Sequence, residues 1–147
     1  MDTKLTLAAL SSFSEAYSGA CKPICRELGI PQMAFDILMF LGNNPDCSTA
    51  KEISRYRGFK ENIISVNVNK LVNEGLLLRE SDREDRRKVH LRCTEKAAPI
   101  IRRGRALQEQ FIARMLSGLS REELRIHTHC LETIAGNAKR MLEEKQP

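Results

Sequence analysis

The chain has 147 residues and a formal net charge of +5, and 41% of its residues are hydrophobic. This apolar content suffices for one compact core and excludes general disorder, while two complete domains would be small for this length. No apolar run approaches the roughly 20 residues of a membrane-spanning helix, and the modest positive charge permits an anionic partner such as nucleic acid without requiring one.

The N-terminus and the cysteines point to a compartment. The first residues lack the charged region, the long apolar stretch and the cleavage site of a signal peptide. The five cysteines are odd in number and widely spaced, which disfavours a disulfide scaffold and favours reduced thiols. We therefore expect a cytoplasmic protein that does not associate with a membrane.

Helical periodicity opens the chain. Apolar residues three and four positions apart predict a helix over 5–28, which Gly29 ends. Pro31 is placed to begin a second helix, and the breaker cluster at 42–45 ends it.

A helix-turn-helix candidate follows. Thr49 and Glu52 have the spacing of a capping box at the start of a short helix that ends at Gly58. A second helix is predicted over 60–74, with Gly75 as its C-terminal cap.

The next stretch predicts a β-hairpin with a long polar tip. Leucines at 76–78 form the first strand, and 88–93 alternates strictly between apolar and polar residues. The inward set is Val89, Leu91 and Cys93, and the outward set is Lys88, His90 and Arg92.

Two long helices complete the chain. The first is predicted over 94–116, with Thr94 as its N-cap and with Pro99 kinking it or delaying its start. The second is predicted over 120–144 and begins with a Ser-x-x-Glu capping box. The fold class is therefore mainly α with a small β-hairpin.

The order helix, turn, helix, hairpin is that of a winged helix, in which 60–74 would read DNA. Its inward face carries Ile64, Val68 and Leu71. Its opposite face carries Asn62, Ser65, Val66, Asn69, Lys70 and Asn73. Asn can pair with adenine, Ser can donate or accept, and Val can contact a thymine methyl group. Four asparagines, Asn67 included, lower helix propensity without an obvious structural return, which favours DNA reading over an ordinary solvated face.

The hairpin tip, 79–88, is the second signal for nucleic acid. Its basic side chains, among them Arg83, Arg86 and Arg87, could reach phosphates or enter an A·T-rich minor groove. The alternative is a solvated turn whose acids and bases pair with one another.

Two segments resemble the MarR family of winged-helix regulators. Residues 68–76 are similar to the end of that family's recognition helix, and 82–87 are similar to its wing, followed by a strand and the helix entry at 93–97. The resemblance in helix order covers nearly the whole chain. Two positions depart from the pattern: Val66 stands where many relatives have Arg, and Ala98-Pro99 interrupts a helix that is usually regular.

The resemblance implies a homodimer that binds pseudo-palindromic double-stranded DNA. One recognition helix would occupy the major groove of each half-site, and one wing the minor groove. Ser65, Val66, Asn69 and Lys70 match recognition positions, whereas Asp85 matches an acid that orients an arginine and Arg86 the arginine that enters the groove. DNA-binding residues would span about 31–95 and dimerisation helices about 5–28 and 96–144. Release by a small molecule or an oxidant is also implied.

Dimerisation also follows from the residues. The predicted helices 5–28, 94–116 and 120–144 carry more apolar stripe than a small winged core can cover, and pairing with a second copy would bury it.

The remaining reactive side chains point to no second chemistry. Cys21 and Cys25, one helical turn apart, could form a redox pair, but both lie on the apolar stripe, where a buried structural role is favoured. No phosphate loop, catalytic arrangement or zinc-ligand spacing is present, so we expect no enzyme, no metal and no cofactor. The leading hypothesis is a homodimeric DNA-binding repressor; the alternative is a winged-helix module that binds protein and not DNA.

Overall fold

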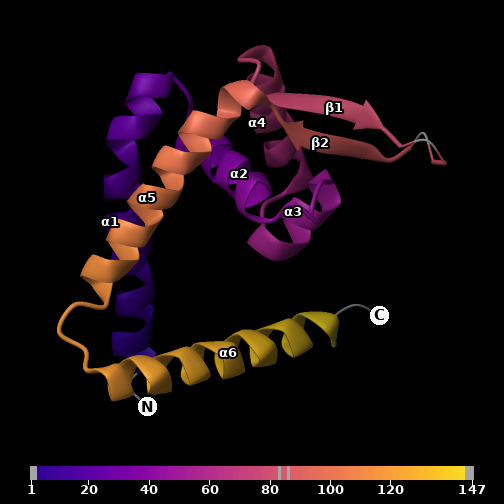
Figure 1. Cartoon of the computed structure of the whole chain (residues 1–147). Coiled ribbons are helices and arrows are strands. Elements are labelled where there is room, and N and C mark those ends of the chain that lie inside the picture. The colour runs from indigo at the N-terminus through magenta and orange to yellow at the C-terminus, as the bar shows by residue number, and fades with distance from the viewer. Residues whose placement is uncertain (1–2, 83, 86, 145–147) are drawn as a thin grey trace. The chain divides into compact units, whose positions relative to one another are not determined.

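The computed structural model describes residues 3–82, 84–85 and 87–144, apart from the side chains of Thr3 and Leu142. It confirms the predicted class, mainly helical with one hairpin (Figure 1). The elements are α1 (Thr3–Leu28), α2 (Gln32–Asn43), α3 (Ala50–Arg57), α4 (Glu61–Asn73), β1 (Leu77–Ser81), β2 (Val89–Cys93), a 3-10 turn (Glu95–Ala97), α5 (Ala98–Met115) and α6 (Arg121–Glu143). The chain divides after Phe111 into two compact units, each described by itself.

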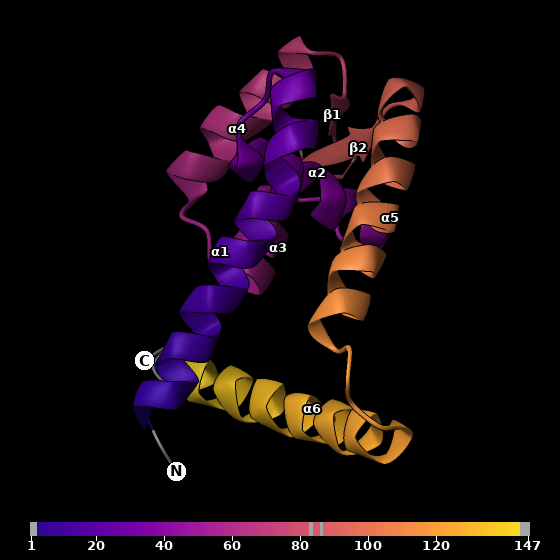
Figure 2. The same ribbon diagram turned by 90° about the vertical axis from the view of Figure 1, so that its left-hand side faces the viewer.

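Helix α2 forms the centre of the first unit, and it lies between α1 and α5 (Figure 2). Six of its twelve residues are buried, because apolar side chains occur on almost every side of this short helix. The residues that join them in one core are contributed by α1, α3, α4, the hairpin and the start of α5, for example Cys21, Ile53, Ile64, Leu77 and Ile101.

The caps predicted around α3 are confirmed. Thr49 accepts a hydrogen bond from the backbone N–H of Glu52, and the Glu52 carboxylate accepts from the backbone N–H of Thr49. Gly58 ends the helix with a φ of 68°, a left-handed conformation that favours glycine.

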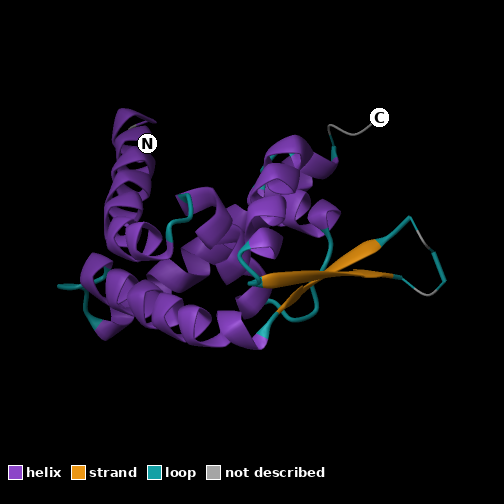
Figure 3. Cartoon of the chain, turned by 90° about the horizontal axis from the view of Figure 1, so that it is seen from above, coloured by secondary structure: helices purple, strands orange, loops and turns teal. Residues whose placement is uncertain are grey.

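The two strands form an antiparallel hairpin in which Leu77 pairs with Cys93 and Ser81 with Val89. Figure 3 shows the hairpin extending away from the helices that surround its base. The predicted alternation holds at Leu91, which is buried, and at Cys93, which is half-buried, whereas Val89 near the tip is exposed. Only the base of the hairpin therefore belongs to the core.

The start of α5 differs from the prediction. Thr94 has an extended backbone but makes no side-chain cap, because its hydroxyl donates instead to the carbonyl of Gly75, 2.7 Å away. A 3-10 turn comes between Thr94 and α5, and Pro99 is the second residue of α5. The delayed start expected from Pro99 is confirmed, and the cap expected from Thr94 is wrong.

The close approach of α5 to α2 depends on Gly104. A Cβ atom at this position would collide with Met39 Sδ and would lie 3.1 Å from Phe35 Cζ. Both neighbours are buried core side chains, so neither has room to move aside.

The second unit contains the last turn of α5 and helix α6. The predicted capping box of Ser120 and Glu123 is confirmed. None of the described residues of α6 is buried, and its large apolar side chains Ile126, Leu131, Ile134 and Met141 are exposed. No helix in the described part of the chain is long and apolar enough to cross a membrane.

Replacing Gly104 with Ala is expected to destabilise the protein by about 1–3 kcal/mol, because the added methyl group overpacks the contact between α5 and α2. Urea unfolding measures the change. The matched control is Gly19→Ala in α1, where an added Cβ would meet nothing within 4 Å and helix propensity predicts no loss of stability. Equal stability of the Gly104→Ala and Gly19→Ala proteins would contradict this account of the packing.

Candidate nucleic-acid interface

Helix α4 presents the polar face predicted for it. Ile64, Val68 and Leu71 are buried against the core. The candidate reading residues Asn62, Ser65, Val66, Asn69 and Lys70 are all exposed, and Val66 retains 66% of its accessible surface. An exposed valine beside short polar side chains suits contact with a thymine methyl group.

Asn67 differs from the other asparagines of α4. It is buried, and its Nδ2 donates to the carbonyl of Ile63, 2.8 Å away. Asn67 therefore has a structural role in the core, which the sequence pattern did not predict. The helical period does indicate this burial, because residue 67 lies three positions after Ile64 and four before Leu71, on the inward face.

Asn69 is tied to the hairpin. The guanidinium of Arg79, on β1, donates to Asn69 Oδ1 at 2.5 Å. The bond fixes the orientation of the amide and leaves its NH₂ group pointing away from the Arg79 guanidinium. Arg79 was missed as a site residue, because only the folded hairpin brings it beside α4.

Two aspartates organise the wing turn by accepting hydrogen bonds from backbone N–H groups. The sequence alone suggests instead that they pair with arginines. Asp82 Oδ1 accepts the backbone N–H groups of Glu84 and Asp85 at 2.8 and 2.9 Å. Asp85 Oδ1 accepts the backbone N–H of Arg87 at 3.0 Å. Arg87 is exposed, whereas the predicted contacts Arg83 and Arg86 lie outside the described residues.

These bonds hold the pKa of Asp82 well below its usual range. The backbone N–H of Asp85 contributes most, followed by the side chain of His90 and the backbone N–H of Glu84. A carboxyl group whose pKa is lowered by folding contributes stability at pH values above its unfolded pKa. This contribution decreases as the pH falls from the unfolded pKa through the lowered value, so the turn is expected to persist in mild acid.

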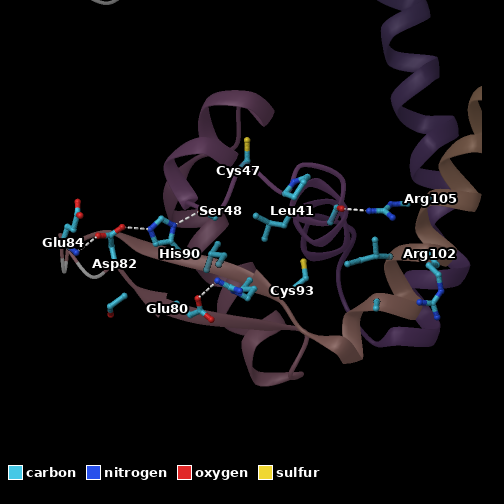
Figure 4. Close-up of a pocket in the computed structure, with 17 residues that line it drawn as sticks. Leu41, Cys47, Ser48, Glu80, Asp82, Glu84, His90, Cys93, Arg102 and Arg105 are labelled. Carbon is cyan, nitrogen blue, oxygen red and sulfur yellow. Dashed lines mark hydrogen bonds and ion pairs between the residues drawn. The ribbon is translucent and has the colours of Figure 1, made fainter.

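His90 does not point outward as expected. Its Nδ1 lies 2.7 Å from Ser48 Oγ, just before α3, and its Nε2 lies 2.9 Å from Asp82 Oδ2 (Figure 4). The outward orientation predicted for His90 is therefore replaced by a bridge from the wing to the helix-turn-helix. A strand alternation cannot predict this, because Ser48 is 42 positions away in the sequence.

Ser, His and Asp are also the residue types of a hydrolytic triad. In the serine proteases the hydroxyl lies at Nε2 and the carboxylate at Nδ1, whereas Ser48 and Asp82 occupy the reverse positions. The second oxygen of Asp82 holds backbone N–H groups. The arrangement therefore differs from a catalytic triad, and the three side chains link the wing turn to the segment just before α3.

A groove of about 1130 Å³ lies beside this bridge, between the hairpin, the end of α2 and the start of α5 (Figure 4). Cys47, Cys93, Arg102 and Arg105 are among its lining residues. No three or more His, Cys, Asp or Glu side chains in the described part of the chain are arranged to hold a metal ion.

The comparison with known families agrees with this geometry. A family model described as MarR family matches residues 28–88, from the end of α1 to the wing. Residues 28–88 of the chain therefore match the MarR family. A search of curated proteins found no similar sequence.

Solved MarR-family structures share the whole fold. A MarR protein from Peptoclostridium difficile is 19% identical with a TM-score of 0.86, over 98% of this chain and 93% of that one. A MarR-family transcriptional regulator from Listeria monocytogenes, solved with a 26mer DNA, is 16% identical with a TM-score of 0.83, over 96% and 95%. A MarR transcriptional regulator from Methanosarcina mazei is 20% identical with a TM-score of 0.82, over 96% and 94%.

The paired cysteines lie in the core of the first unit. Cys21 and Cys25 are both buried, as the apolar stripe predicts. Burial raises the pKa of both thiols, that of Cys25 to about 11. At neutral pH both are therefore thiols and not the reactive thiolates that oxidant sensing requires.

We expect Cys21 and Cys25 of the native protein to react with iodoacetamide at pH 7.5 roughly 100-fold or more slowly than the same residues in guanidinium chloride, because burial suppresses both access and ionisation. Peptide mapping by mass spectrometry after timed quenching measures each rate. Native rates equal to the unfolded rates would contradict the structural role and support a redox role for this pair.

Proposed function

We propose that the chain is a sequence-specific DNA-binding transcriptional regulator. The observation that carries the proposal is the division of α4 into a face buried in the core and an exposed face of short neutral polar side chains. Solvated helices are usually rich in Glu and Lys, which are better helix formers than Asn. The exposed residues instead combine donors and acceptors with the apolar side chains of Ile63 and Val66, and base edges in the major groove can be distinguished by such a set.

We assign base contacts to α4 and backbone contacts to the wing. Asn62, Ser65, Val66, Asn69 and Lys70 are proposed to face the major groove. Arg83, Arg86 and Arg87 are proposed to contact phosphates or the minor groove, where negative potential attracts Arg. The Listeria relative was solved with DNA, which supports assigning duplex DNA to this chain as partner.

A homodimer is the second part of the proposal. In the single chain, large apolar side chains are exposed along the start of α1 and along α6, including Leu5, Leu7, Leu10, Ile134 and Met141. Association with a second copy would bury them. Residues 5–28 and 96–144 are proposed to dimerise, while about 31–95 bind DNA, so a dimer would recognise two related half-sites.

We further propose that the dimer is a cytoplasmic repressor released by a small molecule. A dimer bound across two half-sites excludes other proteins from that DNA. The groove beside the hairpin could admit a small molecule and would couple its binding to the position of the wing. Oxidation of a cysteine is the competing trigger, and Cys47, which lines the groove and is only partly buried, is better placed for it than the buried pair.

The alternative is a winged-helix module that binds another protein and not DNA. The acidic residues of the wing and the small net charge leave this open. Selection of duplexes from a random-sequence pool at low salt separates the two: retention of related palindromes supports DNA recognition, whereas retention of no duplex favours the protein-binding module.

Asn69→Ala is expected to relax base preference at one position of each half-site by about 1–3 kcal/mol, because one side chain reading a base edge contributes about this much. Repeating the selection with the variant measures the preference position by position. An unchanged preference profile for Asn69→Ala would remove Asn69 from the reading face.

Arg87→Ala is expected to weaken binding nearly equally for all duplexes and to reduce the slope of log affinity against log salt by about 2, because the dimer loses one phosphate contact in each half-site. Fluorescence anisotropy with the selected duplex at several salt concentrations gives both values. A normal slope for Arg87→Ala would refute the backbone contact.

A further inference from the structure

The position of the wing depends on a small number of anchors. Isolated two-stranded hairpins are marginally stable in water, so the orientation of this one depends on bonds to its neighbours. Thr94 is bonded to Gly75 at the base of the hairpin, and the backbone N–H of Leu91 donates to the carbonyl of Ser48 at 2.6 Å. Among the bonds that join described hairpin residues to the helix-turn-helix, that of His90 lies nearest to the turn, since His90 pairs with Glu80 in the ladder.

Hydrogen-bonding capacity determines the tautomer of this bridge. The Asp82 carboxylate can only accept, so His90 Nε2 carries the proton and donates to it. In the neutral ring Nδ1 is then an acceptor, and the hydroxyl of Ser48 donates to it. Within the bridge, the Ser48 hydroxyl, both ring nitrogens of His90 and Oδ2 of Asp82 therefore each have a hydrogen-bond partner.

Both ends of the bridge are fixed. Ser48 donates its backbone N–H to the Glu52 carboxylate at 2.8 Å, within the capping interactions of α3. Asp82 organises the turn through its second oxygen, and that turn includes Arg87. One chain of hydrogen bonds therefore runs from the start of α3 through the imidazole to the wing turn, as Figure 4 shows for its central part.

We propose that His90 is a positioning residue for DNA binding: by bridging Ser48 and Asp82 as the Nε2–H tautomer, it sets the wing at the distance from α4 that a DNA duplex requires. The inference rests on the proposed DNA-binding function. His90 itself does not contact DNA. It restricts the orientations of the wing in the free protein, so less conformational entropy is lost when DNA binds.

The test compares two replacements for His90. A glutamine side chain can accept from Ser48 and donate to Asp82, whereas leucine can do neither. We expect His90→Leu and Ser48→Ala to weaken binding of the selected duplex by roughly 3- to 10-fold, as the loss of one or two hydrogen bonds would. His90→Gln should stay within about twofold of the wild-type protein, and base preference should be unchanged in all three.

The controls separate positioning from general destabilisation. Glu80→Gln removes the cross-strand ion pair with Arg92 but no bond to α3, so it should not reproduce the loss. Thermal unfolding of each variant shows whether the fold survives. Equal affinities of His90→Leu and His90→Gln, or a loss in both, would overturn the positioning role.

A second measurement needs no DNA. Two-bond proton–nitrogen spectra of the imidazole in the free protein should show a protonated Nε2 and an unprotonated Nδ1, and Ser48→Ala should shift the Nδ1 resonance. An Nδ1–H tautomer, or no response to Ser48→Ala, would overturn the bridge even if DNA binding is confirmed. A wild-type protein that retains no duplex but shows these spectra would instead overturn the DNA-binding function and leave the bridge intact.

Discussion

The burial of α2 is the constraint on which the rest of the first unit depends. Phe35, Ile37 and Leu38 are fully excluded from solvent, and each such side chain contributes about 1.5–3 kcal/mol relative to exposure. A twelve-residue helix buried on almost every side must be covered by other elements, and α4 covers part of it with Ile64 and Leu71. The polar face of α4 is exposed because its apolar face is required against α2.

Hydrogen bonds join the exposed face of α4 to the wing. Arg79 joins β1 to Asn69 in the middle of α4, and Thr94 joins the end of β2 to Gly75 just after α4. The bridge through His90 reaches further out, to the turn itself. Base reading and backbone contact are therefore set by a common framework, which explains how a two-stranded hairpin of marginal intrinsic stability could act as a defined arm.

Most of the fold could be predicted because its signals are local. Capping boxes, glycines at helix ends and the 3.6-residue period act within a few positions of the chain, and the caps at Thr49 and Gly58 are confirmed. The outward residues of α4 follow from the same period. Partnerships across the fold were not predictable: the Thr94 hydroxyl finds Gly75, and His90 finds Ser48, in each case because a distant segment offers a better partner than the local backbone or solvent.

Dimethyl sulfate interference on the selected duplex tests the central claim most directly, because the reagent methylates guanine N7 in the major groove and adenine N3 in the minor groove. If α4 reads bases and the wing lies in the adjacent minor groove, N7 methylation should abolish binding within two symmetric half-sites, and N3 methylation should weaken it at the flanking A·T pairs. Binding that tolerates methylation in both grooves throughout the duplex would contradict the assignment of α4 as the reading helix.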